Sequence, residues 1–145
     1  MSRWITEEPL DLQRLIQESE DHASGALIIF AGTVRDNHAG QPVSGMTYEA
    51  YVPLAEKALQ QIEQEALQKY EIRSCRIQHR IGDLALGEAS VLIVVRAAHR
   101  DAAYQASRYA IEELKQRAPI WKHEHYLSGE SRYLDGIPLE RNENP

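Results

Sequence analysis

Two lysines and a short basic pair carry the chemistry that this sequence suggests. Lys115 and Lys122 stand on either side of Pro119, and His99 and Arg100 lie upstream of them. Lysine suits covalent or proton-transfer chemistry because desolvation or a nearby cation readily lowers its pKa. An arginine offers a planar fork of donors that matches carboxylate and phosphate groups. In an acidic chain these groups indicate a site for an anionic small molecule.

These side chains are expected where elements begin and end. Residues 91–95 form a continuous apolar run typical of a strand that is covered on both faces. Asp101 is the expected N-cap of a helix over residues 101–117. Pro119 should end that helix, because the residue before a proline is pushed out of the helical region. The lysines can therefore converge only through the chain reversal at the proline.

Each group also has an ordinary structural interpretation. Lys115 near a helix C-terminus is common dipole and solubility chemistry. His99 and Arg100 after a strand would often be a surface pair, and Lys122 could be a solvated neighbour of a buried Trp121. Only their combination, together with Arg35 at the end of another expected strand, favours a site.

Length and composition restrict the class of protein. A chain of 145 residues is most simply one domain, here residues 1–134 followed by a tail at 135–145. A net charge of -6 argues against non-specific nucleic-acid binding, which requires a basic surface. One cysteine, Cys75, excludes an intramolecular disulfide and fits a reducing compartment. Without a membrane-length apolar run or a signal-like N-terminus, a cytoplasmic protein with no membrane partner is expected.

Hydrophobic periodicity predicts an α+β fold. The order of elements indicates a mostly antiparallel or mixed sheet packed with three main helices, and not a doubly wound nucleotide fold. The strands over 25–35 and 43–51 are expected to form a long hairpin with an exposed, mobile tip at 36–42. Helices are predicted at 10–20, 53–70 and 101–117, and strands at 25–35, 43–51, 73–81, 89–98, 120–127 and 132–134.

Several chemistries have no support in the sequence. There is no phosphate-binding loop of the nucleotide-binding type and no nucleophile elbow. His123 and His125 would share a strand face, but no third ligand stands at a convincing spacing, so no metal site is expected. Cys75 is more simply a small buried strand residue than a thiol nucleophile.

The sequence resembles the large, catalytic subunit of molybdopterin synthase. The resemblance rests on FAGTVR at 30–35, YEAY at 48–51, HRIG at 79–82, AHR at 98–100 and above all KQRAPIWKHE at 115–124. The match runs in order from about residue 10 to 134, and the tail beyond it matches poorly.

The resemblance implies the α/β-hammerhead fold of that family and a sulfurtransferase of molybdenum cofactor biosynthesis. Sulfur would pass from the C-terminal thiocarboxylate of a small ubiquitin-like partner to cyclic pyranopterin monophosphate, forming a dithiolene without a cofactor of the large subunit's own. The family assembles as a homodimer within a heterotetramer. Carried over by position, Lys115 and Lys122 would be catalytic, and the substrate-binding residues would be Thr33, Val34, Arg35, His99, Arg100, His123 and Glu124.

Two alternatives and one geometric expectation accompany this hypothesis. A non-catalytic relative could bind a pterin phosphate or a ubiquitin-like partner, and a separate hydrolase or transferase could act on another phosphorylated molecule. A helix over 101–117 would separate Arg100 from Lys115 by about 22 Å, at about 1.5 Å per residue. A two-fold dimer in which one subunit's His99 and Arg100 complete the other's lysine pocket would resolve that separation.

Overall fold

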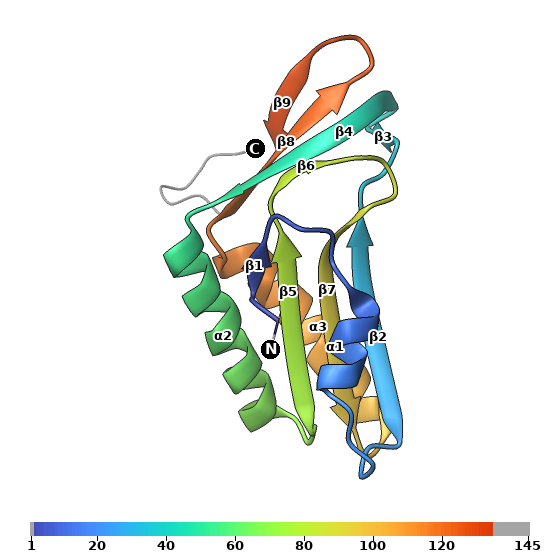
Figure 1. Cartoon of the computed structure of the whole chain (residues 1–145), viewed down its shortest axis with the longest axis vertical. Coiled ribbons are helices and arrows are strands. Elements are labelled where there is room, and N and C mark those ends of the chain that lie inside the picture. Colours follow the sequence, from blue (N-terminus) through green and yellow to red (C-terminus); the bar gives the residue numbers. More distant parts are fainter. Residues whose placement is uncertain (1, 135–145) are drawn as a thin grey trace.

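Two β-sheets and three helices make up residues 2–134, which a computed structural model describes (Figure 1). The expected α+β class is confirmed. The first sheet has the order β1 (Ile5–Thr6), β5 (Ser74–Arg80), β7 (Ala89–Ala97), β2 (Ala26–Thr33). The second has the order β3 (Asn37–His38), β4 (Gln41–Ala50), β8 (Ile120–Tyr126), β9 (Ser131–Leu134), and β6 (Gly82–Leu84) pairs with β4. The helices are α1 (Leu12–Glu18), α2 (Val52–Lys69) and α3 (Arg100–Arg117).

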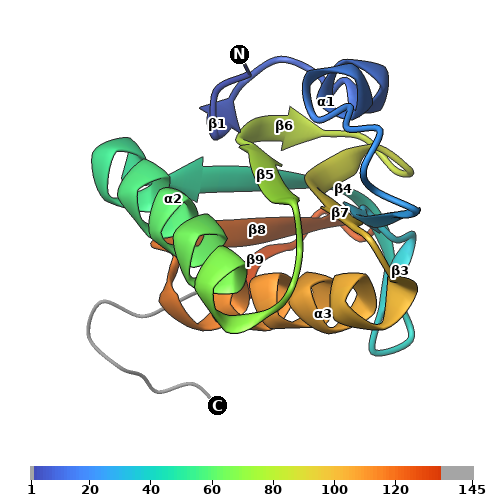
Figure 2. The ribbon, with the colours of Figure 1, turned by 90° about the horizontal axis from the view of Figure 1, so that it is seen from below.

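The central strand β7 is covered on both faces, as its apolar run predicts. Helices α2 and α3 lie on one face of the first sheet and α1 on the other (Figures 1 and 2). Ile93 and Val95 belong to the core shared with α2 and α3, whereas Leu92 and Val94 pack against Leu15 of α1. Burial of alternate side chains on opposite faces follows from the two-residue repeat of a strand. This arrangement makes β7 the rigid centre of the first sheet.

The predicted start of α2 and the predicted end of α3 are correct, but the predicted N-cap of α3 is wrong. Pro53 lies in the first turn of α2, and α3 ends at Arg117, before an extended Ala118 and Pro119. The N-cap of α3 is His99, not Asp101. Asp101 lies within the first turn, where its carboxylate accepts a hydrogen bond from the Gln105 side chain at 2.8 Å. Helix α1 is also shorter than the predicted range 10–20.

The predicted long hairpin of β2 and β4 is wrong. Strand β2 pairs with β7 in the first sheet, and β4 pairs with β6 and β8 in the second. The pairing of β2 with β7 shifts register between Gly32 and Thr33, and the pair of Thr33 with Ala89 is its last. The next residue, Val34, is buried against Met46 and Leu84 of the second sheet. The chain therefore changes sheets at this point and does not fold back on itself.

The segment predicted as a mobile tip forms a small hairpin of its own. Strand β3 pairs with the first residues of β4. The turn between them is made by Ala39 and Gly40, with φ of 52° and 83°. Positive φ at both central residues is the geometry that suits a two-residue hairpin turn. His38 is thereby placed at a defined position beside the second sheet.

The remaining strands, β1 and β9, lie near the two ends of the described chain. Strand β1 pairs in parallel with β5 at the edge of the first sheet. The strand predicted at 132–134 is present as β9, which pairs with β8. The predicted tail at 135–145 lies outside the described residues. Within residues 2–134, no helix is long and apolar enough to cross a bilayer.

A buried carboxyl on α2 predicts how stability depends on pH. Glu63 is 7% exposed and accepts a hydrogen bond from the Ile77 backbone N–H at 2.8 Å. Burial raises the pKa of Glu63 to about 7. Because the unfolded chain releases this proton at lower pH, the free energy of unfolding should fall as pH rises toward 7, by up to about 3 kcal/mol.

Glu63→Gln keeps the hydrogen-bond acceptor but cannot ionise. Urea unfolding at pH 5, 6, 7 and 8 should show the variant gaining stability relative to wild type as pH rises. A difference between the two proteins that stays constant over this range would contradict the prediction.

Candidate functional site

A cavity of about 400 Å³ lies where the two sheets meet the end of α3. Each sheet contributes one wall, and the chain reversal at Pro119 connects α3 to β8 beside it. Five of the residues predicted from the sequence line this cavity: Thr33, Arg35, Lys115, Lys122 and Glu124. The further lining residues are Phe30, Gly32, His38, Met46, Tyr48, His79, Ser90, Val91, Ile111, Leu114, Ala118 and Ile120.

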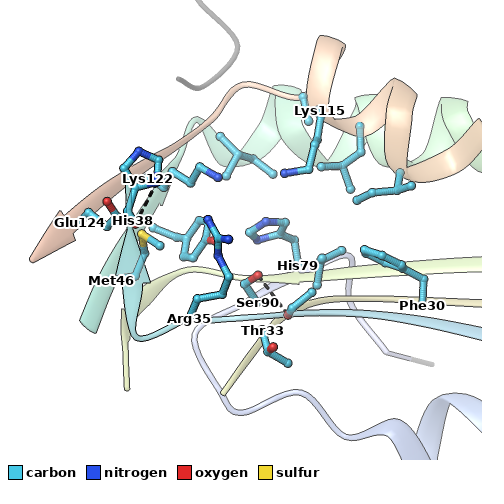
Figure 3. Close-up of a pocket in the computed structure, with 17 residues that line it drawn as sticks. Phe30, Thr33, Arg35, His38, Met46, His79, Ser90, Lys115, Lys122 and Glu124 are labelled. Atoms are coloured by element: carbon cyan, nitrogen blue, oxygen red, sulfur yellow. Dashed lines mark hydrogen bonds and ion pairs between the residues drawn. The ribbon is translucent and has the colours of Figure 1, made fainter. Parts of the chain in front are cut away.

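The two lysines enter the cavity from different elements. Lys115 comes from the last turn of α3 and Lys122 from β8, and their side chains point toward each other across the cavity (Figure 3). The last turn of α3 is held to α2 by Arg117, whose two terminal nitrogens donate to Glu65 at 2.6 and 2.9 Å. These hydrogen bonds lower the pKa of Glu65 to about 2. The ion pair thus orients the turn that carries Lys115.

The end of β2 and the residues that follow it supply the opposite wall. Thr33 and Arg35 line the cavity, while Val34 between them is buried in the second sheet. The Val34 backbone N–H donates to the Glu88 carbonyl at 3.0 Å, which fixes the backbone here. Arg35 is exposed and has no ion-pair partner among residues 2–134. Its guanidinium group is therefore available for an anion that enters the cavity.

One carboxylate faces these cations. Glu124 is 3% exposed and accepts a hydrogen bond from the Tyr126 hydroxyl at 2.6 Å. Its other oxygen lies 3.9 Å from His38 Nδ1. His123 is on the opposite face of β8, where its ring stacks on Tyr133 with 4.2 Å between centroids. Strand alternation therefore directs Glu124 into the cavity and His123 away from it.

His99 and Arg100 do not line the cavity of their own chain. Both are exposed at the N-terminus of α3, and Lys115 lies at its C-terminal end. Fifteen residues of one helix separate Arg100 from Lys115, or about 22 Å at about 1.5 Å per residue. A single chain does not bring the two groups together, and their roles stay predictions.

Reasoning from the sequence missed several polar lining residues, above all Tyr48 and His79. The His79 ring packs edge-on against Tyr48, with 5.0 Å between centroids. Burial lowers the pKa of His79 to about 4, and the charges of Lys115 and Lys122 act in the same direction. Burial also raises the pKa of the Tyr48 hydroxyl. A histidine on the apolar face of a strand was the available signal, but a core role explains that pattern equally well.

The cavity favours an anionic ligand. Its charged lining groups include three cations, Arg35, Lys115 and Lys122, and one carboxylate, Glu124. That carboxylate already accepts a hydrogen bond from the Tyr126 hydroxyl. Within the described part of the chain, no group of three or more His, Cys, Asp or Glu side chains is placed to hold a metal ion. The arrangement can bind an anion and stabilise negative charge that develops beside the lysines.

Comparison with known proteins identifies the family. A family model described as MoaE protein matches residues 5–117. The molybdopterin synthase catalytic subunit of Bacillus subtilis is 45% identical over 126 residues, covering 87% of this chain and 80% of the relative.

Solved structures agree with this match. Molybdopterin synthase from Staphylococcus aureus superposes with a TM-score of 0.86 at 36% identity, covering 92% of this chain and 96% of that one. A chain from the complex of subunits 1 and 2 of the molybdopterin-converting factor of Helicobacter pylori gives a TM-score of 0.73 at 25% identity, with 93% and 92% covered. The resemblance found in the sequence is confirmed, and the chain belongs to the MoaE protein family.

Proposed function

We propose that this chain is the catalytic subunit of a molybdopterin synthase and acts as a sulfurtransferase. It transfers sulfur from the C-terminal thiocarboxylate of a small ubiquitin-like partner to cyclic pyranopterin monophosphate. The observation that carries the proposal is the cavity itself, in which Lys115, Lys122 and Arg35 converge in a chain of net charge -6. The family match supplies the reaction that such a cavity would serve.

The lining groups suit both negatively charged reactants. Arg35 would hold the phosphate of the pterin, because a guanidinium group binds phosphate oxygens in a bidentate manner. Lys115 would lie nearest the terminal glycine of the partner and act on its thiocarboxylate or the acyl intermediate, with Lys122 assisting from β8. The sulfur arrives on the partner, so the reaction requires neither a cysteine nucleophile nor a cofactor of this chain. The buried Cys75, whose pKa burial raises to about 12, suits a core role.

A second copy of the chain would complete the site by pairing along β2. This strand is the edge of the first sheet, and no strand among residues 2–134 pairs with its free side. Leu27 and Ile29, which face outward from it, are 36% and 39% exposed. A long apolar edge strand is a ready template for pairing with another chain. A two-fold axis through β2 would cover this edge in both copies.

Such a dimer would bring together the predicted site residues that lie far apart within one chain. Antiparallel pairing of two β2 strands places the start of one beside the end of the other. Ala26 pairs with Ala97, two residues before His99, whereas the end of β2 leads to Arg35 in the cavity. The length of β2 is about 23 Å at about 3.3 Å per residue, which matches the separation along α3. One copy's His99 and Arg100 would therefore reach the other copy's cavity.

Reconstitution with the thiocarboxylated partner tests the proposed function. The assay follows the mass of the pterin product, in a cytoplasm-like reducing buffer with no added metal or cofactor. Product carrying two sulfurs is expected only with the thiocarboxylate form, and the same partner ending in an ordinary carboxylate is the control. Pterin binding without sulfur incorporation would instead support a non-catalytic binding protein.

Replacing Arg35 with lysine should weaken binding of the pterin phosphate. A lysine keeps the charge but loses the bidentate fork, so KM for cyclic pyranopterin monophosphate should rise by roughly tenfold. The matched control is Arg108→Lys on the exposed face of α3, where Arg108 pairs with Glu112 at 3.5 Å. An unchanged KM in Arg35→Lys would refute the phosphate role.

A further inference from the structure

Arg35, Lys115 and Lys122 give the cavity wall groups that only donate hydrogen bonds, and His79 adds an acceptor beside them. The lining side chains that present an acceptor without a hydroxyl proton are the Glu124 carboxylate and the imidazoles of His79 and His38. His38 lies beside the carboxylate, with its Nδ1 3.9 Å from Glu124. The carboxylate already receives the Tyr126 hydroxyl at 2.6 Å. The cations can bind acceptor atoms of a ligand but cannot receive its N–H groups. An acceptor in the wall is therefore the group that would select a ligand with an N–H donor.

The protonation state of His79 follows from its contacts. Its Nδ1 lies 2.8 Å from the Arg80 carbonyl oxygen, which can only accept, so Nδ1 carries the proton. Burial lowers the pKa of His79 to about 4, with Lys115 of α3 and Lys122 of β8 adding to the effect. The ring is therefore neutral at pH 7, and Nε2 carries a lone pair.

The position of the ring is fixed from several sides. The His79 backbone N–H donates to the Trp4 carbonyl at 2.7 Å, which ties β5 to the N-terminal segment. The edge contact with Tyr48 restrains the ring itself. The side chain points into the cavity toward Lys115 (Figure 3). A restrained acceptor loses little conformational entropy when a ligand binds.

Within the described part of the chain, no hydrogen bond occupies the lone pair of Nε2. Among residues 2–134, the ring of His79 bonds only to the Arg80 carbonyl, and no hydrogen bond joins it to Lys115. The residue is 4% exposed, yet it lines the cavity. An acceptor that lines the cavity near two ammonium groups, with no partner among the described residues, leaves room for a ligand group that accepts from a lysine and donates to the imidazole.

We propose that His79 determines substrate specificity in this site, with Nε2 accepting a hydrogen bond from a ring N–H of the bound heterocycle. This inference rests on the proposed function, in which the substrate is a pterin phosphate with N–H groups on its rings. Arg35 and the lysines recognise the charge of the substrate, and His79 recognises its heterocycle. A phosphorylated molecule without a suitably placed N–H would leave Nε2 unsatisfied and bind less well.

Two substitutions separate the acceptor from the shape of the ring. His79→Phe keeps a planar ring against Tyr48 but removes the acceptor, and His79→Gln restores an acceptor at similar reach. Calorimetric titration with cyclic pyranopterin monophosphate should show binding about 10- to 100-fold weaker in the Phe variant. Binding by the Gln variant should stay within a few-fold of wild type. Both variants should bind the small partner as wild type does.

Nitrogen NMR of the wild-type protein tests the same contact without a substitution. Of the six histidines, His79 is assigned by the ring signals that disappear in His79→Gln. Its Nε2 signal should be that of an unprotonated nitrogen, and saturation with the pterin phosphate should move it toward a hydrogen-bonded value. Saturation with inorganic phosphate, which lacks an N–H group, should leave it in place.

The outcomes distinguish this inference from the function on which it rests. Wild-type protein that fails to bind the pterin phosphate overturns both. Normal binding with an Nε2 signal that does not move, or with undiminished affinity in His79→Phe, overturns only the role of His79.

Discussion

Lys115→Ala is expected to remove nearly all sulfur transfer while leaving assembly with the small partner intact. The Lys115 ammonium group enters the cavity from the last turn of α3, where the partner's terminal glycine would react. Loss of a positioned cation that stabilises developing negative charge commonly lowers kcat on the order of 10²- to 10³-fold. Single-turnover assays with the thiocarboxylated partner would measure the loss, and partner affinity would be titrated in parallel.

Matched variants separate chemistry from folding. Lys57→Ala removes an exposed lysine from α2, outside the cavity, and should leave turnover unchanged. Lys122→Ala should lower turnover less than Lys115→Ala if Lys122 only assists. Activity of Lys115→Ala within a few-fold of wild type would disprove its assignment as the main catalytic lysine.

A mixture of Arg100→Ala and Lys115→Ala chains should recover activity that neither variant has alone. If the site is shared, a dimer of one Arg100→Ala chain and one Lys115→Ala chain has both substitutions in the same pocket. The other pocket of that mixed dimer is intact. Random exchange makes half of the dimers mixed, so about a quarter of wild-type activity should return. Subunits would be unfolded together, refolded in equal amounts and assayed with the partner.

The β2 edge supplies the control for this experiment. Ile29 is 39% exposed on the outward face of β2, and Ile29→Glu places a charge on the proposed interface. Adding this substitution to both inactive chains should give monomers by sedimentation and abolish the recovery. If each chain carried a complete site of its own, the original mixture would stay as inactive as its parents.

The sequence alone determined most of the elements and four charged residues of the cavity, Arg35, Lys115, Lys122 and Glu124. The apolar run of β7 required burial on both faces, and Pro119 required α3 to end before Lys122. These are local effects, set by sterics and by the periodicity of neighbouring side chains. The family resemblance, carried mainly by residues 115–124, rests on the same local information.

Tertiary structure alone decided which strands pair and which groups meet. The hydrophobic pattern of β2 fits a hairpin with β4 as well as it fits pairing with β7, because alternation defines the faces of a strand but not its neighbour. Whether Glu124 or His123 points into the cavity likewise depended on which face of β8 the cavity occupies.

The clearest case is His79. A histidine on an apolar strand face is typical of a core residue, and His79 is buried. Only the packing of β5 against Tyr48 and the ends of α3 and β8 turns that buried ring toward two lysines. Long-range packing, which no local pattern encodes, therefore decided that this histidine lies in the cavity wall.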